Sequence, residues 1–348
     1  MEPMHDSGAA VAVAPPSDSP DTSVQPTLRV VDLNTTFRAR GLTVHAVRDV
    51  NLELYPGEIT VLLGESGSGK SVTARSVMRL YGPGAELSGR VELEGRELLS
   101  LSPKAMLPIR GAQIAMIPQD PTAALDPLRR IGAQLVEVLR QHSMVPNRKA
   151  ASVRALELLD QVGIPDPPRV ARSFPHELSG GMRQRAVIAI AVSCNPKVLI
   201  ADEPTTALDV TVQAQILDLF GRLIGELGSA VLLVTHDVGV AEEVGDRLGV
   251  MYAGRIVEFG PAGAVLRDPR HPYTRALLDS IPTPGVERGR LRSIVGQPPV
   301  SGELSPGCAF ANRCPHALST CNETDAELQA VGIGRTAACH LLDRTVAA

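Results

Sequence analysis

The sequence lacks the features of a chain that crosses a membrane or leaves the cell. Its best apolar run, 186–192, is far shorter than the roughly 18 to 20 residues that a membrane-spanning helix needs. No lysine or arginine precedes Arg29, so residues 1–27 lack the positive end of a secretory signal and are expected to form a disordered tail. We therefore expect a cytosolic protein whose five cysteines stay reduced.

A basic surplus is also missing. The 348 residues carry 34 Lys and Arg against 38 Asp and Glu, a net charge of −4, which gives no reason to expect nucleic acid as a partner. Aromatic residues make up only 3%, but 44% hydrophobic and 21% charged residues are typical of a globular α/β protein and argue against disorder or a fibrous repeat. At about 150 residues per domain, the length predicts two domains.

From residue 28 onward, short apolar runs that predict strands alternate with stretches of helical spacing. The expected strands are 28–33, 43–54, 59–63, 114–117, 198–201, 230–234, 248–252 and 255–259. Two helical stretches, 131–141 and 150–162, follow each other without a strand and predict an inserted helical subdomain at about 119–180. The βαβ order predicts a parallel sheet in residues 28–260, and a smaller second domain is expected at 261–348.

Residues 64–71 read Gly-Glu-Ser-Gly-Ser-Gly-Lys-Ser and match the phosphate-binding loop pattern G-x4-G-K-[ST] between a buried strand and a helix. Lysine occurs only four times against 30 arginines, so a chance match is expected in roughly three of a thousand such chains. Lys70 is expected to reach the β and γ phosphates and the Ser71 hydroxyl to ligate Mg2+. The residues expected to bind nucleotide are Gly64, Ser66, Gly67, Gly69, Lys70 and Ser71.

Two acids follow the apolar run 198–201. Carboxylates at the carboxyl end of a parallel strand lie where ligands of such sheets bind. Asp202 is expected to hold Mg2+ through water, and Glu203 to polarise the water that attacks the γ-phosphate. Alternatively, the two acids before Pro204 are solvated residues without a catalytic role. The phosphate loop upstream argues against this alternative.

Ser179, Gly180 and Gly181 precede a helical run and predict a second anion site at a helix N-terminus. One nucleotide needs only one phosphate loop. At this point the sequence resembles the ATP-binding cassette (ABC) ATPases, P-loop NTPases with a RecA-like core, in which this signature completes the site of the other subunit in a head-to-tail dimer. The resemblance covers about residues 28–260.

The resemblance implies further site residues. Gln119 would sense Mg2+ and the γ-phosphate, Asp209 would organise the dimer seam, and His236 would contact the γ-phosphate. An aromatic residue ahead of the phosphate loop stacks on adenine in this family. Phe37 is the candidate, with His45 as the alternative and a core role for Phe37 left open.

Four of the five cysteines, Cys308, Cys314, Cys321 and Cys339, have the spacing C-x5-C-x6-C-x17-C. Zinc knuckles usually carry paired C-x2-4-C, whereas wider spacing suits an iron–sulfur cluster, although no ferredoxin spacing is matched. Spacing alone decides little between these sites. The fifth, Cys194, lies in an apolar stretch and is expected in the core.

Residues 271–278, together with Cys308 and Arg313-Cys314-Pro315, resemble the C-terminal region of oligopeptide, dipeptide and nickel importer ATPases. With four thiols present, this resemblance implies a [4Fe-4S] cluster, with zinc or no metal as alternatives. It also implies an ATPase at the cytoplasmic face of the membrane that drives uptake of dipeptides or oligopeptides. The implied partners are two membrane-spanning permease subunits, a second ABC ATPase, for which a heterodimer is favoured over a homodimer, and, indirectly, an extracytoplasmic solute-binding protein.

Three other functions stay open at this point. The same importer class could carry nickel or haem. A soluble ABC ATPase of translation or DNA repair would usually carry two cassettes or long coiled coils, which this sequence lacks. A P-loop kinase with a redox cluster would have no use for the signature at 178–182.

Overall fold

The computed structural model describes residues 24–39, 42–206, 208–280, 294–299 and 306–342. Most of the expected N-terminal tail, residues 1–23, lies outside these ranges. Within them, no helix is both long enough and apolar enough to span a bilayer.

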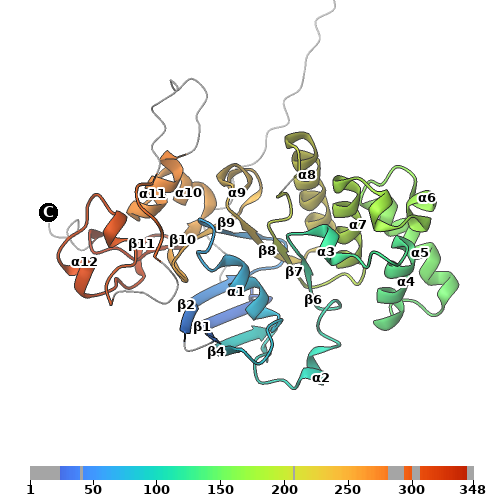
Figure 1. Cartoon of the computed structure of the whole chain (residues 1–348), viewed down its shortest axis with the longest axis horizontal. Helices are drawn as coiled ribbons and strands as arrows, with labels where there is room; N and C mark the ends of the chain where they lie inside the picture. The colour runs from blue at the N-terminus through green and yellow to red at the C-terminus, as the bar shows by residue number, and fades with distance from the viewer. Residues whose placement is uncertain (1–23, 40–41, 207, 281–293, 300–305, 343–348) are drawn as a thin grey trace, which may run out of the picture.

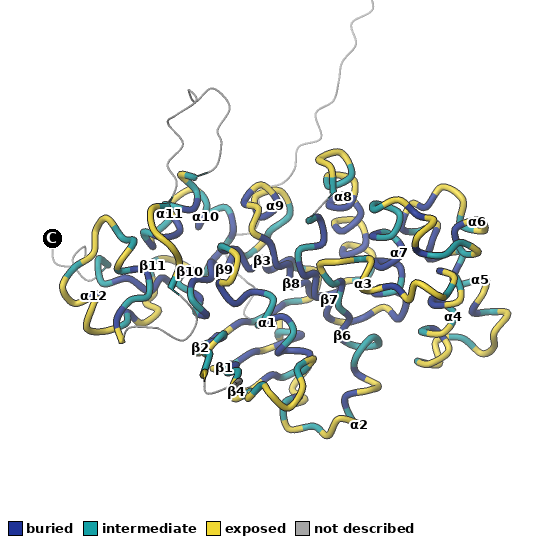
Figure 2. Tube along the Cα trace, in the orientation of Figure 1, coloured by how far each residue is buried: buried dark blue, intermediate teal, exposed yellow. Residues whose placement is uncertain are grey.

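A central sheet of eight strands runs through the molecule in the order β11-β12-β10-β9-β3-β8-β7-β6 (Figure 1). The strands from β9 to β6 are parallel, and the others pair antiparallel. Every residue of β3, β7 and β8 is buried, because both faces of the parallel part are covered (Figure 2). The bounds are β3 Ile59–Leu63, β6 Ile114–Ile117, β7 Val198–Asp202, β8 Ala230–Thr235, β9 Arg247–Tyr252, β10 Arg255–Pro261, β11 Gln329–Gly332 and β12 Arg335–Ala337.

A second, antiparallel sheet of four strands covers one face of the central sheet. Its order is β2-β1-β4-β5, with bounds β1 Leu28–Ala39, β2 Leu42–Leu54, β4 Ala85–Leu93 and β5 Arg96–Glu97. Leu28, Val30 and Val91 from this sheet pack in one apolar cluster with Leu62 and Leu232 of the central sheet. A larger cluster fills the opposite face, so the central strands separate two cores.

Between β6 and β7 the chain forms helices, at the place where the sequence predicts an inserted helical subdomain. They are α3 Pro121–Ala124, α4 Ile131–Gln141, α5 Arg148–Gln161, α6 Pro167–Arg172, the 3-10 turn η1 Pro175–Glu177 and α7 Gly180–Val192. The expected helix 131–141 is α4, and Leu135 and Leu139 bury one of its faces. Asn147 caps α5, because its side chain accepts a hydrogen bond from the Ala150 N–H.

Other helices connect the strands of the two sheets. They are α1 Lys70–Val77, α2 Pro103–Met106, α8 Val210–Leu227, α9 Val238–Val244 and α10 Ala262–Arg267. The chain after residue 267 adds α11 Pro272–Asp279, the 3-10 turn η2 Ala311–Arg313 and α12 Thr320–Glu323.

The sequence predicts that the sheet ends near residue 260, but the structure continues it with β12 and β11. Glu258 and Phe259 of β10 pair with Ala337 and Thr336 of β12. Strands of three and four residues are too short to show a period of two, which is why the sequence pattern misses them. The C-terminal region is therefore joined to the cassette by backbone hydrogen bonds.

A buried carboxylate strengthens this junction. Glu258 is fully buried and accepts hydrogen bonds from the N–H groups of Arg270 and His271, both at 2.9 Å. The guanidinium of Arg335 on β12 donates to the same carboxylate at 3.2 Å. The charge of Glu258 is thus paired and hydrogen-bonded, as a buried charge requires.

Candidate functional site

Four segments that carry expected site residues meet at one edge of the central sheet. Strands β3, β8, β7 and β6 are parallel neighbours, so their carboxyl ends share this edge (Figure 1). At these ends lie, in this order, the phosphate loop 64–71, His236, Asp202 with Glu203, and Gln119. Ligands of open α/β sheets bind outside such an edge.

The phosphate loop joins β3 to α1, as the sequence predicts. Ser66 and Gly67 are exposed at the tip of the loop, whereas Gly64 lies buried directly after β3. Gly69 has a φ of +106°, and a Cβ at this position would meet the Ala46 carbonyl oxygen of β2 at 2.6 Å. Only glycine fits this turn, which brings β2 close to the loop.

Lys70 is 4% exposed, and its ammonium group lies inside the loop. Its Nζ donates to the carbonyl oxygens of Gly64 at 2.7 Å and Glu65 at 2.9 Å. Burial lowers the pKa of Lys70, while the carboxylates of Glu203, Asp202 and Glu65 raise it. These acids oppose the effect of burial and favour the charged form of the lysine where phosphates would bind.

Ser71 and Asp202, which are both expected to hold Mg2+, are hydrogen-bonded to each other. The Ser71 hydroxyl donates to Asp202 Oδ1 at 2.6 Å, and Arg75 Nη2 lies 3.4 Å from Oδ2 of the same carboxylate. Asp202 is fully buried; burial raises the pKa of its carboxyl, and the bonds to Ser71 and Arg75 oppose this. A hydroxyl beside a buried carboxylate at the phosphate loop is a donor set of the kind that Mg2+ prefers.

Glu203 is held by three neighbouring side chains. Its Oε2 accepts hydrogen bonds from Gln119 Nε2 at 3.0 Å and Thr206 Oγ1 at 2.9 Å, and His236 Nδ1 lies 3.3 Å away. The backbone of Glu203 has a φ of +49°, an unfavourable conformation that its N–H bond to the Val234 carbonyl helps to hold. The structure thus places the expected water-polarising carboxylate between the two expected γ-phosphate contacts.

The residues of the expected second anion site lie at the N-termini of α7 and α8. Ser179 is exposed, and its Oγ caps α7 by accepting a bond from the Met182 N–H at 3.3 Å. Asp209 caps α8 in the same way through the Val212 N–H at 2.9 Å. A Cβ on Gly181 would touch the Val212 side chain, so the two caps are neighbours. A Cβ on Gly180 would lie 3.8 Å from the Leu208 side chain.

The two candidates for adenine stacking point to opposite faces of the β1–β2 pair. Phe37 pairs with Val44, whereas Thr36 pairs with His45 and bonds to its Nδ1 at 3.0 Å. Successive side chains of a strand alternate between the faces, so Phe37 and His45 are separated. The half-buried Phe37 ring packs edge-on against Tyr81, with the ring centroids 5.0 Å apart.

The four C-terminal cysteines line one cavity of about 10 Å3, together with His271, His316 and His340. Burial raises the pKa of the Cys308 thiol to about 11. In the described part of the chain, no group of three or more His, Cys, Asp or Glu side chains has the geometry of a metal site. Cys308, Cys314, Cys321 and Cys339 thus lie around one space that has room for about one water molecule, and the described residues show no ligand set for the cluster that the sequence leads us to expect. Cys194 is buried, as expected.

Sequence reasoning missed three side chains that contact the site. Thr206 bonds to Glu203, Tyr273 accepts a hydrogen bond from the Glu65 N–H at 2.9 Å, and Arg313 pairs with the Glu65 carboxylate at 2.7 Å. Tyr273 and Arg313 are more than 200 residues away along the chain. No local spacing signals such contacts; the only signal is that both residues lie in the segments that carry the C-terminal resemblance.

The fold and the sheet-edge site define an ATP-binding cassette. Residues 47–206 match the family model described as ABC transporter, and residues 257–321 match the one described as oligopeptide/dipeptide transporter, C-terminal region. The dimeric post-hydrolysis structure of the ATP-binding cassette MJ0796, bound to ADP and Pi, is 29% identical with a TM-score of 0.61. The match covers 68% of this chain and 98% of that one. CbiO1 of Clostridium perfringens, part of an ABC transporter complex, is 27% identical with a TM-score of 0.60, over 70% and 91% of the two chains.

Curated relatives are closer in sequence. A putative peptide import ATP-binding protein of Brucella melitensis is 49% identical over 89% of this chain and 95% of its own length. The dipeptide transport ATP-binding protein DppD of Bacillus subtilis is 46% identical over 91% and 95%. The oligopeptide transport ATP-binding protein OppD of Mycobacterium tuberculosis is 49% identical over 91% of this chain, which spans only 52% of that relative. The chain belongs to the ABC transporter family, among its oligopeptide/dipeptide-type ATP-binding proteins.

Proposed function

We propose that this chain is the ATP-binding and ATP-hydrolysing subunit of an importer that drives uptake of dipeptides or oligopeptides. The observation that carries the proposal is the Glu203 carboxylate, held by Gln119, Thr206 and His236 beside the Ser71–Asp202 pair. The printed names of the relatives and the match of the C-terminal region support peptides as cargo.

The proposed roles follow from the positions of the side chains. The phosphate loop and Lys70 bind the phosphates of ATP, and Glu203 accepts a proton from the attacking water. His236 and Gln119 hold that carboxylate and lie where they can contact the γ-phosphate. Ser71, Asp202 and Gln119 would hold Mg2+, which neutralises phosphate charge when bound. Phe37 is proposed to stack on adenine.

The proposal includes a second cassette. Ser179, Gly180, Gly181 and Asp209 lie at the N-termini of α7 and α8, where Ser179 and Asp209 cap the helices and the Ser179 side chain is exposed. A helix N-terminus of this kind favours an anion, so it is proposed to complete the ATP site of a second cassette. A heterodimer with a related ATPase is favoured, and a homodimer is the alternative.

The substitution Glu203→Gln tests the catalytic assignment. The amide keeps the size and the hydrogen bonds of the side chain but cannot accept a proton from water. We expect ATP binding to remain and phosphate release to fall at least about a hundredfold. Glu243→Gln, an exposed acid on α9, is the matched control and should keep normal turnover. Near-normal phosphate release by Glu203→Gln would refute the assignment.

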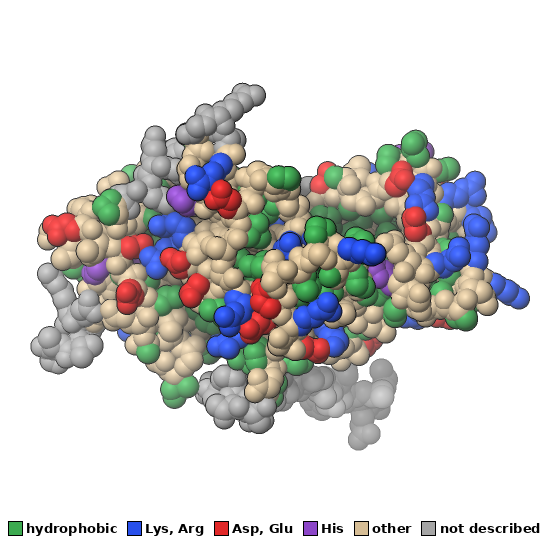
Figure 3. Space-filling model, turned by 90° about the horizontal axis from the view of Figure 1, so that it is seen from below, with side chains coloured by type: hydrophobic (Ala, Val, Ile, Leu, Met, Phe, Trp, Pro, Cys, Tyr) green, Lys and Arg blue, Asp and Glu red, His purple; other side chains and the backbone are tan. Residues whose placement is uncertain are grey.

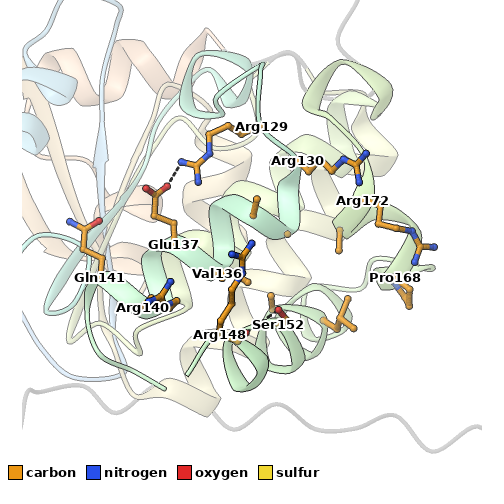
Figure 4. A pocket seen from close by; sticks show the side chains of 15 residues that line it. Arg129, Arg130, Val136, Glu137, Arg140, Gln141, Arg148, Ser152, Pro168 and Arg172 are labelled. Atoms are coloured by element: carbon orange, nitrogen blue, oxygen red, sulfur yellow. Dashed lines mark hydrogen bonds and ion pairs between the residues drawn. The ribbon is translucent and has the colours of Figure 1, made fainter. Parts of the chain in front are cut away.

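A basic groove is the proposed docking place for a membrane subunit. The groove has a volume of about 790 Å3 and lies between α4, α5 and α6 (Figure 4). Figure 3 shows Lys and Arg side chains gathered at this end of the molecule. The arginines that line the groove are Arg129, Arg130, Arg140, Arg148 and Arg172.

Three of these arginines make no ion pair with another described residue. Arg129 pairs with Glu137 and Arg130 stacks on Phe174, but within the described ranges no ion pair involves Arg140, Arg148 or Arg172. The groove floor includes Val136, Ala155 and Leu156, so it offers apolar contact beneath a positive rim. The occupant that fits is a cytoplasmic loop of a permease subunit with acidic and apolar side chains.

Charge reversal tests this docking place. Arg148→Glu should weaken co-purification with the membrane subunits by about tenfold, while the isolated chain still binds ATP. Lys149→Glu makes the same charge change on the next residue, which does not line the groove, and serves as the control. Equal effects of the two substitutions would contradict a specific role for the groove. Such docking would place the chain at the cytoplasmic face of the membrane.

The [4Fe-4S] cluster expected from the sequence remains a proposal. Support comes from Cys308, Cys314, Cys321 and Cys339, which line one cavity and are the ligand type of such clusters. In the described residues their side chains are not grouped as metal ligands. A cavity of about 10 Å3 would have to widen to accept the cluster. Protein purified anaerobically should contain iron and show broad absorption near ~400 nm. Absence of both would exclude the cluster and leave zinc or no metal.

Cargo is tested by uptake into cells. Cells that carry the chain as wild type or as Glu203→Gln would be given a labelled dipeptide, with nickel uptake measured in parallel. Loss of dipeptide uptake alone is the expected result. Loss of nickel uptake alone would redirect the cargo, and no change in either would favour haem or a soluble, non-transport ATPase.

A further inference from the structure

The C-terminal region contacts Glu65 of the phosphate loop through Arg313 and Tyr273. Arg313, at the end of η2, donates from Nη1 and Nη2 to the two carboxylate oxygens of Glu65 at 2.7 and 3.0 Å. Its side chain is only 5% exposed, and that of Glu65 is 26% exposed. A bidentate ion pair between a buried guanidinium and a carboxylate fixes both the orientation of the two groups and the distance between them.

An aromatic cluster holds this guanidinium in place. Tyr252 of β9, Tyr273 of α11 and Phe310 are almost fully buried, and their ring centroids lie 4.5 to 5.4 Å apart. The Arg313 guanidinium lies over the Tyr252 and Phe310 rings, and its Nη1 also donates to the Tyr252 hydroxyl at 3.2 Å. Arg313 is therefore fixed by stacking and by hydrogen bonds on several sides.

Tyr273 holds the backbone of the same loop residue. Its hydroxyl accepts the Glu65 N–H at 2.9 Å, and its own position is fixed because α11 begins at the His271 cap, where Nδ1 accepts the Tyr273 N–H at 3.0 Å. The Glu65 N–H thus points to the C-terminal region and not into the phosphate site. The Glu65 carbonyl accepts a hydrogen bond from Lys70 Nζ at 2.9 Å.

We propose that Arg313 and Tyr273 are positioning residues for ATP binding, which hold Glu65 and through it the loop and the Lys70 ammonium. Three groups of Glu65 are engaged at once: its carboxylate by Arg313, its N–H by Tyr273 and its carbonyl by Lys70. Without the bonds to its carboxylate and its N–H, Glu65 lets the loop and Lys70 sample positions in which phosphate binds less well. The C-terminal region thereby sets the affinity of the cassette for ATP.

The inference rests on the proposed ATPase function and deepens it. It also connects the cysteine cavity to the nucleotide site, because Cys314 directly follows Arg313, and Cys308 lies two residues before Phe310. Phe310 lines the cysteine cavity and packs on Tyr273. A change in the packing around the four thiols can therefore reach Glu65 through Phe310 and its neighbours Tyr273 and Arg313.

A double-mutant cycle in the full-length chain tests the proposal. Glu65→Gln and Arg313→Gln each remove one side of the ion pair, and each should raise the KM for ATP about tenfold with kcat changed less than about threefold. The double substitution should raise KM no further than either single one, because the two residues act through one contact. Tyr273→Phe removes only the hydroxyl and should raise KM by about threefold.

Arg255→Gln is the matched control. It breaks the Arg255–Asp325 ion pair of 2.6 Å, which also joins the C-terminal region to the central sheet but does not touch the phosphate loop. Its KM should stay within twofold of wild type. An equal rise in KM for Arg255→Gln would show that docking of the region in general is responsible and would overturn the proposal.

Two other outcomes would also overturn it: an unchanged KM in Glu65→Gln and Tyr273→Phe, or single effects that multiply in the double variant. These variants keep most of the packing, so they remain informative even if Arg313→Gln fails to fold. The controls separate this failure from failure of the proposed function. If wild-type chain binds ATP and turns it over, the function stands while the positioning role falls; if it does neither, the function itself falls.

Discussion

The nucleotide edge and the C-terminal region are held together by different forces. At the nucleotide edge, four parallel strands pair in continuous register and lie between two large apolar cores. In the C-terminal region beyond α11, the described strands are two short ones, and contact with the cassette depends on an aromatic cluster, ion pairs and a few backbone bonds. Because backbone pairing holds the nucleotide edge together, we expect its folding stability to depend little on single exposed side chains. The stability of the C-terminal region depends on individual side chains.

The largest expected effect lies at the nucleotide edge. Lys70→Ala removes the ammonium group that the loop encloses, so ATP binding and turnover should fall at least about a hundredfold while the melting temperature changes little. Nucleotide binding, turnover and thermal unfolding would be measured together. Lys197→Ala removes a surface lysine that pairs with Glu94 and should leave turnover intact. Retention of more than a tenth of wild-type turnover in Lys70→Ala would contradict the assigned role.

A smaller effect is expected from an added methyl group in the C-terminal region. Gly307 is buried, and a Cβ there would overlap the backbone of Cys321 and Asn322. Gly307→Ala should therefore destabilise this region by roughly 1 to 3 kcal/mol. Hydrogen exchange should become faster at residues 306–342 and stay slow in β3, β7 and β8.

Gly263→Ala is the control for this second prediction, because a Cβ there meets only the flexible end of the Arg267 side chain. Its exchange rates should match those of the wild type. If Gly307→Ala speeds exchange in the central strands as much as in the C-terminal region, the two regions unfold together and the contrast drawn between them is wrong.

The smallest expected effect is a gain in stability from a substitution on the exposed side of α8. Gly221 is exposed on α8, and a Cβ at this position would have no atom within 4 Å, so Gly221→Ala should stabilise the chain by up to about 1 kcal/mol through helix propensity. Urea unfolding and ATP turnover would be measured. A change in turnover beyond twofold would show that α8 is coupled to the nucleotide site.

Much of the cassette could be predicted from local sequence. The strands 59–63 and 114–117 and the helix 131–141 are found with the expected bounds. Each of the two strands is a short apolar run, and the helix has apolar residues at helical spacing. The relatives confirm the family that the phosphate loop and the signature at 178–182 indicate. The roles of the individual site residues stay predictions.

Other features could not be predicted. The strands β11 and β12 are too short to show periodicity, and only strand pairing decides that Phe37 and His45 lie on opposite faces. Glu65 reads in the sequence as an arbitrary residue of the loop pattern. Its partners, Tyr273 and Arg313, are 208 and 248 residues away, and no pattern within one segment reports a contact between segments.

The sequence by itself determined the chemistry: a glycine-rich loop with Lys70 and Ser71, two carboxylates after an apolar strand, and four clustered thiols. These are local features, set by residue type and spacing. Tertiary structure decided which of them meet. Parallel pairing of β3, β8, β7 and β6 brings the nucleotide residues to one edge, and packing of α11 and η2 on β9 brings Arg313 to the phosphate loop. Such contacts depend on the burial of surfaces from distant segments, which no single stretch of sequence contains.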